Sequence, residues 1–170
     1  MNIKNNLMIK DLYYSLYNTP VCPLLYVHDS QGTLFSTEWL TDEKYKDREL
    51  PQMRWPQLEK ELDSYFKGEK PSFSFNVTFD NLTDFTKKVL NAMINIPYGK
   101  VMTYKEMADK IKAPKAVRAV GQACKRNPYP LIIPCHRVVS QTGLGGYSGQ
   151  TGSGDKIDIK RSLLQLEGYL

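Results

Sequence analysis

Cysteine and histidine are scarce in this chain of 170 residues, which contains Cys22, Cys124, Cys135, His28 and His136 and no others of either type. An odd number of widely spaced cysteines argues against a disulfide framework and is typical of a reducing compartment. A structural zinc site takes four Cys or His ligands, and the N-terminal half offers only two such residues. We therefore expect no metal, and no other cofactor is indicated.

Long hydrophobic runs are also missing. No stretch reaches the ~18 apolar residues of a membrane-spanning helix, and the N-terminus lacks the apolar core of a signal peptide. We expect an intracellular protein without a membrane partner, cytoplasmic or, in a eukaryote, nuclear. Hydrophobic residues make up 41% of the chain, enough for a core, and the net charge of +5 leans toward a polyanionic partner without proving one.

The first 80 residues are mixed in character. Apolar β-formers predict strands over 24–27 and 33–35, on either side of a turn. Apolar residues at helical spacing predict a helix over 58–66, which Gly68 ends. Strict alternation over 73–79 predicts a strand with one buried face.

Past Asp80 the pattern becomes helical. Asn81 is a candidate N-cap for the first helix, and Thr103 and Glu106 form a capping-box pattern for the second. Pro114 suits the first turn of the third. The predicted helices cover 81–96, 103–111, 114–126 and 157–167.

The third of these helices has two unlike faces. Apolar or small residues share one face: Val117, Val120, Gly121 and Cys124. Polar and basic residues crowd the other: Lys115, Arg118, Gln122, Lys125 and Arg126. A short helix, a brief connection and a basic second helix are the plan of a DNA-binding helix-turn-helix. The pattern fits equally well an amphipathic helix pair whose basic face is only solvated.

A thiol stands beside an imidazole in the segment Pro134-Cys135-His136-Arg137-Val138. A thiol becomes a strong nucleophile when a nearby base or positive field pulls its pKa from ~8.5 toward neutral or below, so we expect Cys135 to be held as a thiolate. The Cys-His pair alone is weak evidence, because sequence neighbours often point apart. Glu167 lies at the edge of the apolar stripe of the last helix, where a carboxylate needs a partner.

Several motifs in one order resemble the O6-alkylguanine-DNA alkyltransferases, closely over 58–168 and loosely before that. The matching segments are Tyr65-Phe66-Lys67-Gly68, Ile96-Pro97-Tyr98-Gly99, Thr103-Tyr104-Lys105-Glu106, Arg118-Ala119-Val120-Gly121, Asn127-Pro128, Ile133-Pro134-Cys135-His136-Arg137-Val138, Gly146-Tyr147-Ser148-Gly149 and Leu163-Leu164-Gln165-Leu166-Glu167-Gly168. The resemblance implies an α+β fold: a small ribonuclease-H-like α/β domain over 1–80, then a mainly helical, winged-helix-like domain over 81–170 with a helix-turn-helix.

The same resemblance implies direct-reversal DNA repair. The alkyl group on O6 of guanine, and by the same chemistry on O4 of thymine, would pass irreversibly from duplex DNA to Cys135 after base flipping, once per protein molecule. His136 would ionise the thiol through a bound water, and Glu167 would orient the imidazole. Tyr104 would donate to guanine N3 or help to rotate the nucleotide, and Asn127 would hold the surrounding loops.

Further positions are implied on the DNA and the substrate. Arg118 would fill the gap left by the extruded base, with its helix in the minor groove, and Ala119 and Gly121 would allow close approach. The other expected DNA contacts are Lys115, Gln122 and Lys125. The lesion pocket would use Pro130 as a wall, the carbonyls of Cys135 and Val138, the Tyr147 ring and the Ser148 amide. Arg137 would tie the motif into the domain. We expect a monomer, with cooperativity on DNA left open.

Each role has a plainer alternative. Cys135 could be an inert buried thiol, as we expect of Cys22 and Cys124, and Tyr104 a core aromatic residue. For the whole chain, the alternatives are a damage-binding protein without transfer, a helix-turn-helix regulator and a thiol hydrolase. The preferred alkyl size is open, because the loop 150–155 is longer than the family pattern and borders the pocket.

Overall fold

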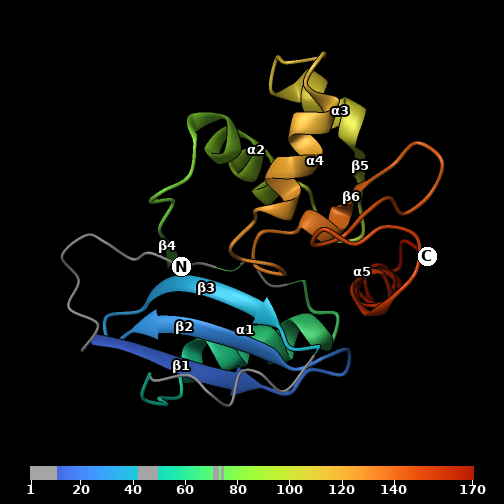
Figure 1. The fold of residues 1–170 in the computed structure, drawn as a ribbon. Coiled ribbons are helices and arrows are strands. Elements are labelled where there is room, and N and C mark those ends of the chain that lie inside the picture. Colours follow the sequence, from blue (N-terminus) through green and yellow to red (C-terminus); the bar gives the residue numbers. More distant parts are fainter. Residues whose placement is uncertain (1–10, 42–49, 71–72, 74) are drawn as a thin grey trace.

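The computed structural model describes residues 11–41, 50–70, 73 and 75–170, and every statement below concerns these residues. A four-stranded sheet occupies one end of the molecule (Figure 1). Its strands, in spatial order, are β1 (Leu12–Tyr17), β2 (Leu24–Asp29), β3 (Thr33–Trp39) and β4 (Asn76–Val77). The first three are antiparallel, and β4 pairs parallel with β3. The predicted strands over 24–27 and 33–35 are confirmed and extend further.

Strand β1 was not predicted. Nearly all of its side chains are apolar or aromatic, so the segment shows no alternation between polar and apolar residues. Its tyrosines nevertheless have high β-propensity, which is the signal that could have identified it. Leu12 packs with Leu25 and Val27 in a small cluster of its own.

Helix α1 (Pro56–Phe66) covers one face of this sheet (Figure 1). Pro56 starts it, since proline at the first helical position loses no hydrogen bond. Leu58 and Leu62 are buried and join the main core with Leu24 of β2. Gly68 follows the helix with φ +78°, as the predicted helix end requires.

The predicted strand over 73–79 is only partly right. Residues 71, 72 and 74 lie outside the described part of the chain, and the described strand is β4 alone. The alternating apolar side chains do face the core, where Phe75 lies 4.9 Å from Trp55 and Phe73 lies 6.0 Å from Tyr65, measured between ring centroids. The alternation over 73–79 therefore indicates that one side of the segment is buried, but it does not indicate the length of the strand.

The rest of the chain is mainly helical. Its elements are α2 (Asp84–Ile94), β5 (Met102–Thr103), α3 (Tyr104–Lys110), α4 (Val117–Lys125), the 3-10 turn η3 (Cys135–Arg137), β6 (Val138–Val139) and α5 (Asp155–Leu166). The mixed α+β prediction is confirmed. One core runs from β2 and β3 through α2 and α4 to α5, and the domain boundary at residue 80 stays a prediction.

The helix starts show which local signals were reliable. Thr103 and Glu106 form the predicted capping box: the Glu106 amide donates to Thr103 Oγ1 at 3.1 Å and the Thr103 amide to Glu106 Oε2 at 2.7 Å. The prediction of Asn81 as a cap was wrong. Thr83 caps α2 by accepting from the Thr86 amide, whereas Asn81 has φ +64° in the preceding turn.

The start of α4 was also predicted wrongly. Pro114 and Lys115 lie in a turn, and the helix begins at Val117, after the Ala116 amide has bonded to the carbonyl of Ala113 at 2.9 Å. Val117 is exposed and does not share the buried face that we assigned to it. None of the helices in the described ranges is long and apolar enough to cross a membrane.

Candidate active site

The Cys-His motif lies in a short turn between two buried segments. Pro134 precedes η3, and β6 follows it and pairs parallel with β5, with Val138 opposite Met102. This pairing brings the motif to the start of α3, because β5 ends one residue before Tyr104. Cys135 is 5% exposed, so only a small part of its surface is open.

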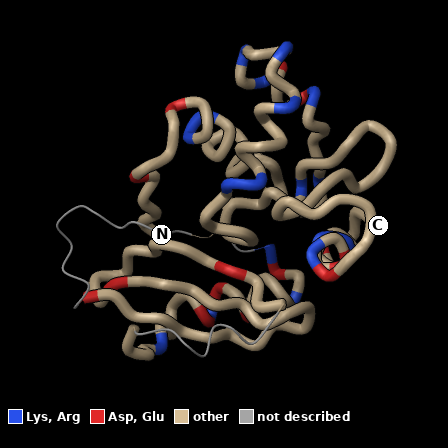
Figure 2. The backbone as a smooth tube through the Cα atoms, viewed as in Figure 1, with Lys and Arg blue, Asp and Glu red and all other residues tan. Residues whose placement is uncertain are grey.

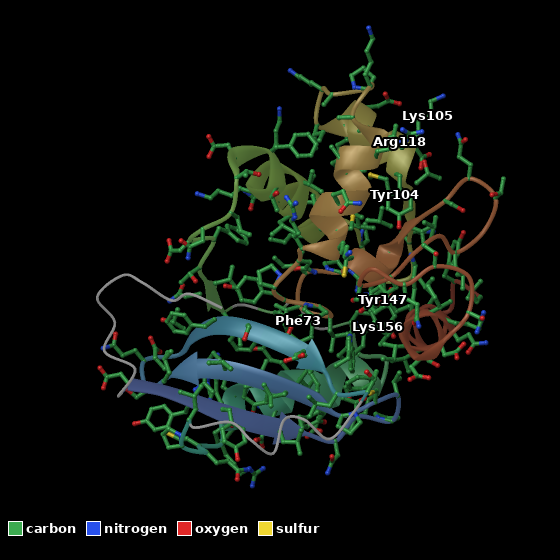
Figure 3. All side chains as sticks on the ribbon, viewed as in Figure 1. Phe73, Tyr104, Lys105, Arg118, Tyr147 and Lys156 are labelled. Carbon is green, nitrogen blue, oxygen red and sulfur yellow. The ribbon has the colours of Figure 1, made fainter. Side chains whose placement is uncertain are left out.

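That open part lines a cavity of about 280 Å³ between α3, α4 and the loop before α5. The cavity joins several residues that are distant in sequence, and Figure 3 shows Tyr104 and Tyr147 on either side of this region. Of the predicted site residues, the lining includes Tyr104, Gly121, Gln122, Lys125, Cys135, Tyr147 and Ser148. Cys124 also lines it, although it is mostly covered by α4.

Glu167, the residue after α5, is the centre of a buried hydrogen-bond network. Its Oε1 lies 2.8 Å from His136 Nε2 and accepts from the Tyr65 hydroxyl at 2.6 Å and from Arg137 Nη2 at 2.9 Å. Its Oε2 accepts from Arg137 Nε at 2.9 Å and from the Gly99 amide at 3.1 Å. The sequence analysis predicted that this carboxylate needs a partner, and in the structure it has several.

This network settles which nitrogen of His136 carries the proton. A carboxylate only accepts hydrogen bonds, so Nε2 of His136 must be the donor to Glu167. Nδ1 of the neutral ring is then an acceptor. It is buried and has no hydrogen-bond partner among the described protein atoms. His136, the residue that follows Cys135 in the sequence, therefore has an unprotonated nitrogen, which is the form of the ring that can take up a proton as a general base.

Burial keeps both members of the pair neutral at rest. Burial lowers the pKa of His136, although Glu167 acts in the opposite direction. Burial also raises the pKa of Cys135, although Asn127, Lys160 and Tyr147 lower it. The expectation of a resting thiolate is therefore wrong, because desolvation of a charged sulfur outweighs the favourable neighbours. To act as a nucleophile, Cys135 must first lose this proton.

Glu167 stays charged. Burial raises its pKa, but three effects outweigh burial and bring the pKa to about 2: the hydrogen bond from His136, the charge that His136 carries once it is protonated, and the hydrogen bonds and charge of Arg137. Since His136 is neutral, the permanent cation that holds the carboxylate ionised is Arg137. Its Nη1 also donates to the carbonyl of Ile96 at 2.6 Å, so Arg137 ties the motif to the domain as expected.

Lys160 is a site residue that we did not predict. It is fully buried, and its Nζ donates to the carbonyls of Val138 at 2.6 Å and Gly146 at 3.1 Å. Burial lowers its pKa to about 8, whereas Cys135 raises it. A signal was present: Lys160 shares a helical stripe with Leu163 and Glu167, at spacings of three and seven residues, and a lysine in an apolar stripe is unusual.

Asn127 holds the loop that leads to the motif. Its Nδ2 donates to the carbonyl of Ile133 at 2.8 Å, and its Oδ1 accepts from the Tyr129 amide at 3.0 Å. These two bonds close the segment between α4 and η3. Pro130, the expected pocket wall, lies elsewhere: it lines a neighbouring cavity of about 320 Å³, which Ser148 also borders.

Tyr104 belongs to the cavity wall more than to the core. It is half-buried, and its hydroxyl donates to the carbonyl of Gly146 at 3.2 Å. Burial raises its pKa to about 12, so the phenol remains a donor at neutral pH. Gly145 allows the ring to lie close, because an added Cβ would come within 2.9 Å of Tyr104 Cε2.

The basic residues of α4 are open to solvent. Figure 2 shows Lys and Arg at the end of the molecule formed by α3, α4 and their connection, and Figure 3 places Arg118 near that end, beyond Tyr104. The exposed members of the predicted DNA-binding set are Lys115, Arg118, Ala119, Gln122 and Lys125. Gly121 is half-buried and faces the Tyr104 ring, with 4.0 Å between its added Cβ and Tyr104 Cε1.

Metal ligands are not gathered anywhere in the described ranges: no three His, Cys, Asp or Glu side chains lie together there as they would around an ion. The absence of a cofactor stays a prediction.

The site combines a buried thiol, a hydrogen-bonded imidazole and a nearby basic helix. Comparison with known proteins identifies the class to which this chain is similar. Residues 84–169 match the family model described as the DNA-binding domain of 6-O-methylguanine DNA methyltransferase. The methylated-DNA–protein-cysteine methyltransferase of Methanosarcina acetivorans is 35% identical over 169 residues, covering 92% of this chain and 99% of that relative. The constitutive one of Bacillus subtilis is 35% identical over 164 residues, covering 91% and 94%.

Solved structures agree. The crystal structure of Mycobacterium tuberculosis O6-methylguanine methyltransferase matches with a TM-score of 0.78 and 34% identity, over 92% of each chain. Another from the same organism, a complex with DNA, matches with a TM-score of 0.76 and 34% identity, over 91% of this chain and 92% of that one. The chain belongs to the methylated-DNA–protein-cysteine methyltransferase family.

Proposed function

We propose that this protein repairs alkylated DNA by transferring the alkyl group from O6 of guanine to its own Cys135. The observation that carries this is a buried thiol on the wall of a cavity, followed in the chain by a histidine whose unprotonated Nδ1 has no hydrogen-bond partner among the described protein atoms. The family to which the chain belongs carries the same activity in the names of its members.

The transfer is a single displacement. The thiol proton passes to His136 Nδ1 through a bridging water, and Glu167 stabilises the imidazolium that results. The sulfur forms a bond to the alkyl carbon while the C–O6 bond breaks, and the electron pair leaves with guanine, which takes up a proton. Tyr104 donates to the departing base as negative charge grows on it, which lowers the barrier. The thioether is stable, so each molecule acts once, and O4 of thymine reacts in the same way.

For DNA binding, α3 and α4 act as a helix-turn-helix. These helices belong to a winged-helix-like domain, which lies beside a ribonuclease-H-like sheet domain. Helix α4 enters the minor groove of double-stranded DNA, and Lys115, Gln122 and Lys125 contact the phosphates near it. An enzyme acting on a stacked base must flip it out, at a cost of a few kcal/mol. Arg118 fills the gap, and Ala119 and Gly121 let the helix approach closely.

The Cys135 and Val138 carbonyls and the Ser148 amide would then recognise the extruded guanine, beside the Tyr147 ring. In this structure the Val138 carbonyl already accepts from Lys160. A carbonyl oxygen has two lone pairs, so one remains for a guanine amino group.

The proposal is tested by intact mass after mixing with a duplex oligonucleotide that contains O6-methylguanine. We expect a gain of one methylene group per protein molecule, on the peptide that holds Cys135, and no further gain with excess DNA. Binding of the damaged duplex without a mass gain would point to a damage-binding protein. A preference among undamaged sequences would point to a regulator.

Arg118→Ala is expected to slow transfer from duplex DNA by about tenfold or more, because the flipped state loses the side chain that fills the gap. Transfer from the free base O6-methylguanine should stay within about twofold of the unaltered rate, since no flipping is needed. Single-turnover rates on both substrates measure this. Arg126→Ala, at the end of α4, is the matched control for loss of a positive charge. Equal slowing on both substrates would show that Arg118 does not fill the gap left by the flipped base.

A further inference from the structure

A hydrogen bond joins the sheet to the reactive-cysteine cavity, and the function proposed above does not use it. Trp39 is the last residue of β3, and its Nε1 donates to the Tyr147 hydroxyl at 3.0 Å. Both side chains are buried, Trp39 at 7% and Tyr147 at 3% exposure. The end of β3 faces the loops of the helical part (Figure 1). A residue from the N-terminal half thus reaches a residue of the cavity wall.

The strand that carries Trp39 is fixed to the same region by two more bonds. The Thr37 amide donates to the carbonyl of Pro128 at 2.9 Å, and its Oγ1 donates to the carbonyl of Pro130 at 2.8 Å. Both acceptors lie in the loop between α4 and the Cys135 turn. The position of the Trp39 ring relative to Cys135 is therefore set by backbone contacts and does not depend on side-chain packing alone.

The direction of this hydrogen bond determines what the Tyr147 hydroxyl can do. An indole N–H only donates, so the Tyr147 oxygen is the acceptor. The one hydrogen of that hydroxyl is then free to point elsewhere. Cys135 lines the same cavity wall, and the Tyr147 and Cys135 side chains affect each other's pKa. Burial raises the pKa of Tyr147 well above its ordinary value, so the phenol does not lose this hydrogen at neutral pH.

We propose that Tyr147 is a catalytic residue whose hydroxyl donates a hydrogen bond to the Cys135 sulfur as that sulfur becomes a thiolate, and that Trp39 is the positioning residue that aims this hydroxyl. Hydrogen bonds to charged groups are about twice as strong as those between neutral groups, so the bond stabilises the anion more than the thiol. The direction agrees with the effect of Tyr147 on the sulfur, since it lowers the pKa of Cys135. This inference deepens the proposed function and rests on it.

According to this proposal, a residue of the sheet affects the acidity of Cys135. If Trp39 were only a core side chain, replacing it would change stability and would not raise the pKa of Cys135. If Trp39 acts through Tyr147, its replacement must weaken the same interaction that loss of the Tyr147 hydroxyl removes. The effects of two residues that act through one contact do not add, whereas those of independent residues do.

The experiment measures alkylation of Cys135 by iodoacetamide between pH 6 and pH 10, followed on the Cys135 peptide by mass spectrometry. The proteins compared are the unaltered chain, Trp39→Phe, Tyr147→Phe, the double variant and Trp55→Phe. Trp55 is the other tryptophan of the chain. It stacks on His28, packs against Phe75 and does not line the cavity, so it is the matched control.

We expect Tyr147→Phe to slow alkylation at pH 7 by about tenfold and to move the pH profile to higher pH, because a hydrogen bond to a charged group is lost. Trp39→Phe should move the profile in the same direction with about threefold slowing, and the double variant should be no slower than Tyr147→Phe alone. Trp55→Phe should keep the profile of the unaltered protein.

An unchanged pH profile in Trp39→Phe, or additive effects in the double variant, would overturn the proposal. If Tyr147→Phe does not fold, the direction of the shift in Trp39→Phe decides. Loss of the aimed hydrogen bond moves the pH profile to higher pH, whereas water admitted by a packing defect lessens the burial of the thiol and moves the profile to lower pH. Transfer from O6-methylguanine duplex is measured alongside. Its absence would overturn the proposed function, whereas iodoacetamide needs no DNA and reports on Tyr147 in either case.

Discussion

Cys135→Ala abolishes alkyl transfer and leaves binding to the damaged duplex within about twofold of the unaltered protein: this is the largest effect that we expect. The sulfur is the only atom of the side chain that can accept the group, and no water can replace it in a displacement that leaves a thioether. The basic side of α4 lies outside the Cys135 turn, so the phosphate contacts that supply most of the affinity are kept. Covalent labelling by alkyl-labelled duplex and fluorescence anisotropy measure the two properties.

Cys124→Ala is the matched control. Cys124 lines the same cavity, but its sulfur contacts Met93 Sδ at 3.7 Å, and burial raises the pKa of its thiol to about 12. It should keep the transfer activity. Label on any other residue of Cys135→Ala would show that the acceptor has been assigned wrongly.

Glu167→Gln should reduce the single-turnover rate by about a hundredfold, since general base catalysis contributes roughly 10²–10⁴ to a rate. An amide can donate as well as accept, so it no longer forces His136 to protonate Nε2 and present Nδ1 to the thiol. The variant also leaves buried Arg137 without its counter-charge, which destabilises the fold by about 3 kcal/mol or more. Rapid-quench transfer assays and urea unfolding measure the two effects, and Glu69→Gln, an exposed carboxylate, is the control.

The difference in the free energy of unfolding between Glu167→Gln and the unaltered protein should become smaller as the pH falls. The pKa of Glu167 is lowered in the folded chain to about 2, below its value in the unfolded chain. Its contribution is therefore complete above about pH 4.5 and is lost as the pH falls toward 2, because the unfolded state binds the proton first. The gap between Glu167→Gln and the unaltered protein should narrow over that interval. A constant gap would show that Glu167 is not ionised in the folded protein.

Local signals in the sequence predicted local structure well. The Thr103–Glu106 pattern identified a capping box because both partners lie within one helical turn. Asn81 and Pro114 misled for a related reason: each is common in helix starts and in the turns that precede them, and which occurs depends on where the buried stripe begins. Strand β1 was missed because a strand with apolar residues on both faces shows no alternation.

The site itself could be predicted only in part. The motif around Cys135 and the α4 pattern indicated the chemistry, whereas the contact between His136 and Glu167 joins residues 31 apart, which no spacing rule supplies. Trp39 and Tyr147 are 108 residues apart, and nothing in either segment pointed to the other. The ionisation state of the Cys135 thiol was predicted wrongly, because the electrostatic cost of burial depends on all the groups packed around the sulfur, among them Asn127 and Lys160.

The place of Glu167 after the Cys135 turn in the sequence has a consequence for how the protein is synthesised. Residues 135 and 136 are made first, and the carboxylate that fixes the ring follows 31 residues after His136. A nascent or truncated chain that stops short of it carries the acceptor sulfur but has no means of choosing the tautomer of its base. On the proposed function, competence for repair therefore begins only after α5 and Glu167 have been made, and a protein that acts once is not consumed before that helix is in place.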